Sequence, residues 1–85
     1  MEIILLPQAM EDLLFWKKSG NIQAQNKITL LLKSILENPY EGIGTPEALK
    51  HELAGKWYKR INKEHRIEYD VCENKINVYQ LHFHY

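Results

Sequence analysis

The first half of the chain carries a short apolar run followed by two stretches with helical spacing. Residues 2–6 are continuously apolar, which predicts a strand buried on both faces. Pro7 suits the first turn of a helix, where its missing N–H costs nothing. The apolar positions that follow it at helical spacing are Met10, Leu13 and Leu14. Lys17 and Lys18 then suit the negative end of that helix.

A second, longer helix is indicated after the link Ser19-Gly20-Asn21. Its apolar positions are Ala24, Ile28, Leu31, Leu32 and Ile35. Polar residues lie between them, and the pattern stops near Glu37, before Asn38-Pro39. The short link between the two segments predicts a helical hairpin.

The second half of the chain changes to a period of two. After a Gly- and Pro-rich loop at 38–46, residues 47–53 fit a short helix or a strand. Strands are predicted at 57–61, 65–72 and 76–83, joined by short turns. In the middle one, Ile67, Tyr69 and Val71 share one face, and Arg66, Glu68 and Asp70 share the other.

This order predicts an α+β fold in one domain, residues 1–85. The elements follow as β-α-α-β-β-β-β, with the helical hairpin packed on one face of a twisted antiparallel sheet. The length of 85 residues supports one modest core. No apolar run approaches the roughly 20 residues of a membrane helix. Cys72 is the single cysteine, which excludes an intrachain disulfide and favours a reducing, cytoplasmic setting.

Charge is balanced over the whole chain but concentrated locally. The sequence has 11 basic and 11 acidic residues, and residues 50–66 hold six of the basic ones, both arginines included. Arginine is the better bidentate ligand for phosphate, so this segment is where an anionic partner would bind. A solvated charged stretch is the alternative interpretation. Nucleotide-fold and serine-hydrolase motifs are absent from the sequence.

Two kinds of chemistry fit the remaining polar residues. Glu47, Arg66 and His84 supply a carboxylate, a guanidinium and an imidazole, with Lys50, Arg60 and Tyr85 as auxiliaries. These groups suit RNA phosphodiester cleavage, as base, phosphate ligand and acid, with no cofactor. Alternatively, His82 and His84 would lie on one side of a strand and supply two ligands of a zinc site. Its third ligand would be His51, His65 or a carboxylate.

A resemblance favours the ribonuclease interpretation. The sequence contains Pro46-Glu-Ala-Leu-Lys-His-Glu-Leu-Ala-Gly-Lys-Trp57, then Arg60-Ile-Asn-Lys-Glu-His-Arg66, then His84-Tyr85. These motifs and their spacing resemble the YoeB (Txe) toxins of the RelE superfamily in type II toxin–antitoxin systems. The first half of the chain is similar mainly in layout. The resemblance also makes residues 48–53 a strand.

The resemblance implies a ribosome-dependent mRNA endoribonuclease that cuts in the A site without a metal and so inhibits translation. By position, Glu47 would be the general base, Arg66 the phosphate ligand, His84 the general acid and Tyr85 the residue that orients the nucleotide. Lys50 and Arg60 match positions that contact RNA, and Lys59 replaces a more usual arginine there. Glu68 stands at a commonly apolar position, where it could pair with Arg66.

Partners are also implied. A YefM-like antitoxin would fold over the toxin, with its acidic residues on segment 50–66. Phe15, Trp16 and Leu30 either leave an apolar face for this antitoxin or for a second copy of the chain, or complete the core. For Leu30 we favour the core. A different class remains open: a non-enzymatic, ParE-like toxin that inhibits gyrase, for which the Glu47, Arg66 and His84 set would be unnecessary.

Overall fold

The fold was analysed in a computed structural model, which describes residues 1–44, 46–48 and 55–82. The chain forms β1 (Glu2–Leu5), α1 (Pro7–Ser19) and α2 (Ile22–Glu37) in its first half. The second half contributes β2 (Glu47–Ala48), β3 (Trp57–Arg60), β4 (Arg66–Cys72) and β5 (Lys75–Gln80). The predicted α+β class and the order of elements are confirmed.

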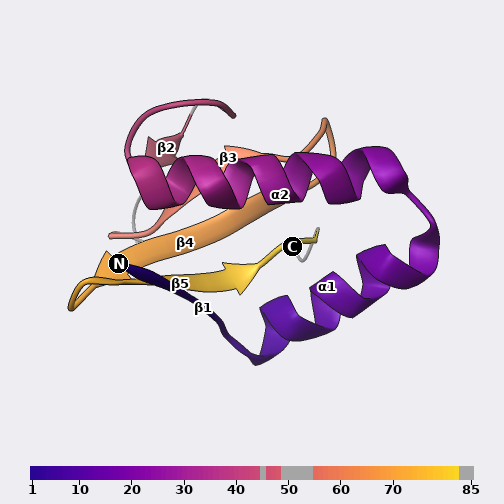
Figure 1. The fold of residues 1–85 in the computed structure, drawn as a ribbon, viewed down its shortest axis with the longest axis horizontal. Coiled ribbons are helices and arrows are strands. Elements are labelled where there is room, and N and C mark those ends of the chain that lie inside the picture. Colours follow the sequence, from indigo (N-terminus) through magenta and orange to yellow (C-terminus); the bar gives the residue numbers. More distant parts are fainter. Residues whose placement is uncertain (45, 49–54, 83–85) are drawn as a thin grey trace.

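The described strands form one five-stranded sheet in the order β1-β5-β4-β3-β2 (Figure 1). The pairs from β2 to β5 are antiparallel, as predicted for strands joined by short turns. β1 instead pairs with β5 in parallel, so the sheet is mixed rather than antiparallel. The helical hairpin follows β1 in the sequence, and the last strand, β5, lies beside β1 and runs in the same direction.

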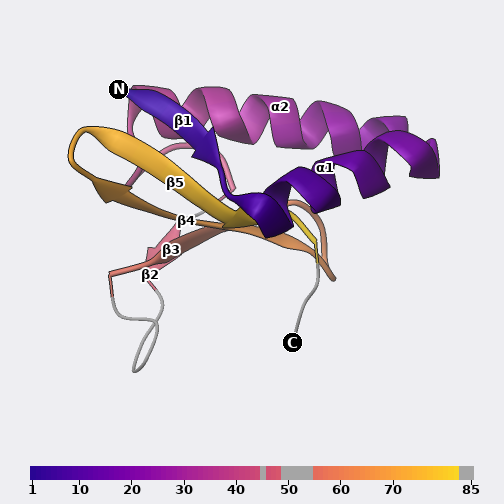
Figure 2. The same ribbon diagram turned by 90° about the horizontal axis from the view of Figure 1, so that it is seen from below.

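Both helices cover one face of the sheet and leave the other face without a helix (Figure 2). We call this second face the open face. The core lies between the helices and the covered face. Its fully buried apolar side chains include Leu31 and Ile35 from α2, Ile67 and Tyr69 from β4, and Ile76 and Val78 from β5. The predicted apolar faces of α2 and β4 are therefore confirmed.

The buried face of α1 differs in part from the predicted one, because Leu13 packs against the core as predicted and the other two positions do not. Met10 and Leu14 are about half exposed, whereas Ala9, Asp12 and Trp16 are buried. These three positions also have helical spacing. Asp12 and Trp16 form hydrogen bonds with the backbone of Leu81, the residue after β5. Leu30 is 53% exposed, so its predicted place in the core is wrong. Trp16 belongs to the core and Phe15 is exposed.

The helix ends follow the local sequence. Asn21 caps α2, since its side-chain oxygen accepts a hydrogen bond from the backbone N–H of Ala24. Gly20 ends α1 in the left-handed conformation that glycine adopts without strain. No helix in the described ranges has the length and apolar character needed to span a membrane.

Candidate active site on the open face of the sheet

Arg66 and Glu68 form an ion pair on the open face of β4. The Arg66 Nε and one of its terminal nitrogens each lie 3.0 Å from Glu68 Oε1. The two side chains are 19% and 8% exposed, so the pair is partly shielded from water. The predicted pairing of these residues is confirmed. The carboxylate orients the guanidinium, and it also competes for the positive charge that a phosphate would bind.

Tyr58 brings the two arginines together. Its ring centroid lies 4.7 Å from the guanidinium carbon of Arg66 and 5.9 Å from that of Arg60. The backbones of Arg60 and Arg66 are also directly opposite each other in the ladder between β3 and β4. The negative face of the ring and the Glu68 carboxylate offset the repulsion between two like charges. Sequence reasoning missed this role of Tyr58, although the alternation of β3 places Tyr58 and Arg60 on one face.

The strand register aligns one row of residues across the sheet. Glu47 is paired with Tyr58, Tyr58 with Glu68, and Glu68 with Gln80. The backbone of the predicted base therefore lies at one end of the row that contains the partner of Arg66. At the other end, Gln80 lies four residues before the predicted acid, His84, in the sequence. Nothing in the sequence alone specified this register.

Three predicted site residues, Lys50, His84 and Tyr85, lie outside the described residues. The strand expected at 48–53 is described only at its first residue, where β2 ends at Ala48. The structure thus brings Arg60, Arg66 and the backbone of Glu47 to one region.

Lys59 corrects the sequence analysis. Its side chain is fully buried, and its ammonium group donates hydrogen bonds to Ser34 Oγ and to the Glu41 carbonyl oxygen, each at 2.9 Å. Burial lowers the pKa of Lys59 below its usual value of 10.5. In this position the ammonium group does not face RNA. Lys59 instead ties α2 and the loop before β2 to β3.

A second polar cluster lies further along the open face. Tyr79 Oη donates a hydrogen bond of 2.5 Å to Asp70, and Asn77 Nδ2 donates one of 3.0 Å to the other carboxylate oxygen. The Lys56 ammonium group lies 4.0 Å from the centroid of the Tyr79 ring. The hydrogen bond to Asp70, with burial, raises the pKa of Tyr79 to about 12. The register shift between β4 and β5 occurs next to this cluster.

The described residues do not provide the ligands that the zinc hypothesis requires. They contain no group of three or more His, Cys, Asp or Glu side chains placed to hold a metal. His82 instead packs against Phe15 and stacks on His65, with the two imidazole centroids 4.4 Å apart. His84, its predicted partner, is outside the described residues.

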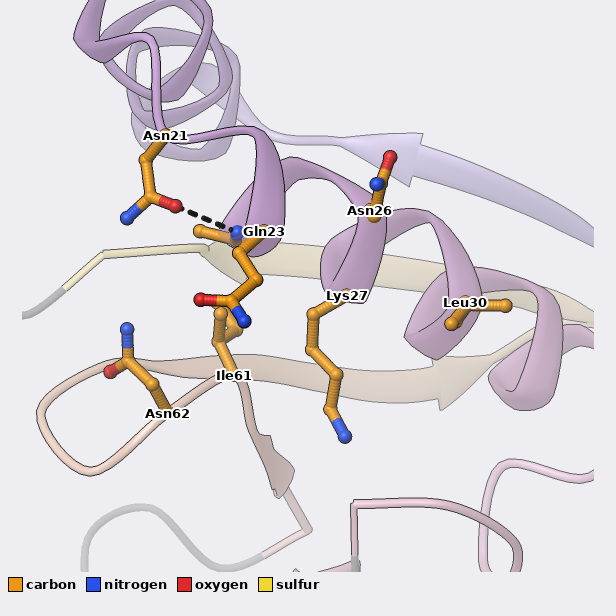
Figure 3. A pocket seen from close by; sticks show the side chains of 8 residues that line it. Asn21, Gln23, Asn26, Lys27, Leu30, Ile61 and Asn62 are labelled. Atoms are coloured by element: carbon orange, nitrogen blue, oxygen red, sulfur yellow. Dashed lines mark hydrogen bonds between the residues drawn. The ribbon is translucent and has the colours of Figure 1, made fainter.

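A pocket of about 350 Å³ lies away from these residues, between the first half of α2 and the loop after β3 (Figure 3). Amide side chains from Asn21, Gln23, Asn26 and Asn62 line it, together with Lys27. None of the predicted catalytic residues contributes to it.

Solved structures of small toxins are similar to this chain over nearly its whole length. The structure of a YoeB/ParE toxin from Agrobacterium tumefaciens is similar, with a TM-score of 0.93 and 33% identity over all of both chains. Two Staphylococcus aureus structures, a YoeB–YefM complex and a YoeB dimer, each have a TM-score of 0.88, with 44% and 42% identity. The alignments cover 98% and 100% of this chain, and 95% and 98% of those chains.

The sequence comparisons specify the family. The model of the YoeB-like toxin of bacterial type II toxin–antitoxin systems matches residues 5–85. A curated "Toxin YoeB" from Mycobacterium bovis is 39% identical over 79 residues, which is 93% of this chain and 92% of that protein. This chain therefore belongs to the YoeB family of type II toxins.

Proposed function

We propose that this toxin is a ribosome-dependent mRNA endoribonuclease that cuts in the A site by metal-independent acid–base catalysis, in the cytoplasm. The observation that supports this most is the cross-strand row from Glu47 through Glu68 to Gln80, with Arg66 held beside it. The backbone of the proposed base and the residue four positions before the proposed acid lie at the two ends of this row, and the proposed phosphate ligand, Arg66, is paired with Glu68 in the middle of it. A non-enzymatic binder has no need of that arrangement.

The proposed reaction needs no cofactor. Glu47 takes the proton of the ribose 2′-OH, and the 2′-oxygen then attacks the adjacent phosphorus. Arg66 stabilises the added negative charge on the phosphate oxygens. The bond to the 5′-oxygen breaks, and His84 donates a proton to that leaving oxygen. Tyr85 orients the nucleotide, and Lys50 and Arg60 bind flanking phosphates.

A YefM-like antitoxin is the proposed inhibitor, and the S. aureus complex of related chains supports it. The arginines of the open face give its acidic residues a binding surface. A homodimer is proposed as a second state, by analogy with the S. aureus YoeB dimer. Met10, Leu14 and Phe15 are exposed apolar side chains of α1 available for such contacts.

The test is single-turnover cleavage of mRNA on ribosomes by Glu47→Gln and Arg66→Ala variants. Glu47→Gln should lower the rate about 10²–10⁴-fold, the usual contribution of general acid–base help. Arg66→Ala should lower it about 10²–10³-fold, because one charge contact to the transition state is lost. Lys75→Ala is the control, since it removes an exposed cation at the start of β5.

Stability needs a separate control for Arg66. Its removal leaves the buried Glu68 carboxylate without this ion-pair partner, which is destabilising. The double variant Arg66→Ala/Glu68→Gln removes that unpaired charge and should be equally inactive while melting cooperatively. Near-normal cleavage by either folded variant would refute the assignment. If a chelator inhibited cleavage and zinc restored it, the metal hypothesis would be favoured. If variants that no longer cleave mRNA still inhibited gyrase, the binding hypothesis would be favoured.

A further inference from the structure

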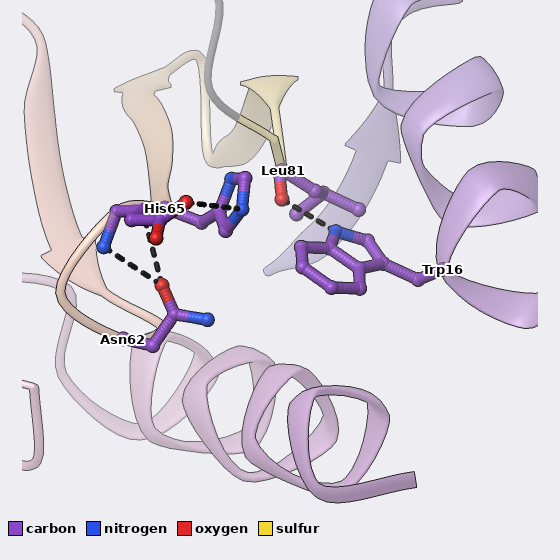
Figure 4. A network of polar contacts seen from close by, with 5 residues as sticks. Trp16, Asn62, His65 and Leu81 are labelled. Carbon is purple, nitrogen blue, oxygen red and sulfur yellow. Dashed lines mark hydrogen bonds and ion pairs between the residues drawn. The ribbon is translucent and has the colours of Figure 1, made fainter. Parts of the chain in front are cut away.

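The backbone of one residue just after β5, Leu81, is held at both its N–H and its carbonyl group. The last residue of the strand is Gln80, and the next residue, Leu81, is fully buried. The Leu81 N–H donates a hydrogen bond of 2.9 Å to Asp12 Oδ2. Its carbonyl oxygen accepts one of 2.7 Å from Trp16 Nε1 (Figure 4). Both partners come from α1, one helical turn apart.

The two partners are themselves held in place. Asp12 and Trp16 are each 3% exposed, so neither hydrogen bond competes freely with water. Gln8, one turn before Asp12, donates a hydrogen bond of 3.1 Å from Nε2 to Asp12 Oδ1. A carboxylate is costly to bury unless hydrogen bonds satisfy it, and Asp12 uses both oxygens for this. A buried aspartate inside an amphipathic helix is therefore explained by its contact with Leu81.

The next residue is held by its ring. The imidazole centroid of His82 lies 4.1 Å from that of Phe15 and 5.5 Å from that of Trp16. His65, in the loop before β4, stacks on the His82 ring, with the two centroids 4.4 Å apart. Two consecutive residues are thus fixed against α1, one through its backbone and one through its side chain. His84 follows Leu81 by three residues, a reach of at most about 10 Å.

We propose that Asp12 and Trp16 are positioning residues for the acid step. They fix the chain at Leu81, and this sets where the segment that carries His84 leaves the sheet relative to Arg66. The inference rests on the proposed function, in which His84 is the acid. Neither residue touches substrate, so both act only through the segment after Leu81. An acid displaced by about 1 Å can lose roughly 10²-fold in rate, so such a hold matters for catalysis.

The experiment compares Trp16→Phe in the wild-type and His84→Gln backgrounds. Phe keeps an aromatic ring but lacks the N–H that donates to Leu81. Asp12→Asn and Asp12→Ala form a second series, in which Asn retains an acceptor for the Leu81 N–H and Ala does not. Ile35→Val is the matched control, because it trims a buried α2 side chain and removes neither hydrogen bond to Leu81. Each variant is assayed for ribosome affinity, single-turnover cleavage rate and melting temperature.

Trp16→Phe should lower the single-turnover rate about tenfold or more, with ribosome affinity unchanged. In the His84→Gln background it should change the rate less than twofold, because its effect passes through His84. Asp12→Asn should retain more activity than Asp12→Ala. Ile35→Val should lower the melting temperature and leave the rate unchanged.

Three outcomes would overturn the inference. In the first, His84→Gln is slow, but Trp16→Phe and Asp12→Ala are both as fast as wild type. The hydrogen bonds to Leu81 then have no role in catalysis, and His84 remains the proposed acid. If Trp16→Phe slows cleavage equally in both backgrounds, its effect is structural. If His84→Gln is as active as wild type, the acid assignment itself fails, and the positioning role fails with it.

Discussion

Arg66 is where sequence pattern and structure agree most fully. Strict alternation in β4 placed Arg66 and Glu68 opposite Ile67 and Tyr69, and the burial of those two residues confirms it. The ion pair between Arg66 and Glu68 is consistent with their spacing of two on a strand, which places both side chains on one face. What spacing could not show is Tyr58, which contacts Arg66 from the neighbouring strand, since register depends on the whole sheet.

Lys59 shows the opposite case. On sequence it belongs to a run of basic residues, where exposure is the normal expectation. Its burial depends on acceptors from Ser34 and Glu41, which lie 25 and 18 residues away in the sequence. Long-range partners of this kind leave no local signal, so the RNA contact predicted for Lys59 was wrong.

Tyr79 gives a prediction for high pH. Its pKa, about 12 in the folded chain, is above its usual value of 10 because of the hydrogen bond to Asp70. The proton is bound more tightly in the folded state, so this contribution to stability is complete below pH 10 and is lost as pH rises towards 12. Tyr79→Phe should therefore lose less unfolding free energy over that interval than wild type does.

Denaturant unfolding at several pH values, with ultraviolet titration of the tyrosines, measures this. Tyr40→Phe is the control, since it removes an exposed tyrosine. If Tyr79→Phe lost as much unfolding free energy as wild type between pH 10 and pH 12, the Tyr79–Asp70 hydrogen bond would be contradicted.

The elements themselves were predictable because local periodicity defines them. α2 begins and ends where its caps and apolar repeat indicated, and β4 and β5 follow their alternation, although β5 ends at Gln80 and not at the predicted residue 83. The face of α1 was not predictable in the same way. Met10 and Leu14 are as apolar as a core position requires, but Asp12 and Trp16 are buried because they contact Leu81, 65 or more residues away.

The loop between α2 and β2 is packed against its neighbours rather than merely connecting them. Tyr69 Oη donates a hydrogen bond to the Pro39 carbonyl, and the Gly44 carbonyl accepts one from the Arg60 N–H. Gly42 has a φ of 97°, and a methyl group added there would collide with the Ser34 hydroxyl. This close approach holds the segment that leads to Glu47.

Gly42→Ala should destabilise the fold more than Gly20→Ala does. Both glycines have positive φ, so each substitution costs about 1–2 kcal/mol of backbone strain. Gly20 has open space around it, whereas Gly42 adds a steric clash of about 1–3 kcal/mol. Urea unfolding of the two variants measures the difference. Equal losses of stability would show that the loop can move away from Ser34 at little cost.

At the scale of the molecule, the open face and the helices have separate tasks. The proposed chemistry lies on the open face, and the helices lie on the other side of the sheet (Figure 2). Two buried charged residues nevertheless connect them. Lys59 ties α2 to the loop before Glu47, and Asp12 ties α1 to the chain before His84. The core therefore holds the chain at Glu41, before the proposed base, and at Leu81, before the proposed acid.

Deleting His84 and Tyr85 tests whether the proposed chemistry can be removed without loss of the fold. Cleavage on ribosomes should fall at least about 10²-fold, because the proposed acid is removed. Stability should change little, since Leu81, the last core residue of the described chain, keeps its hydrogen bonds to Asp12 and Trp16. The measurements are single-turnover cleavage and a thermal melt, with His84→Gln as the full-length comparison. A truncated chain that melts like wild type and still cleaves at the wild-type rate would show that neither residue takes part in the reaction. A truncated chain that fails to fold would show instead that residues 84 and 85 contribute to the stability of the fold.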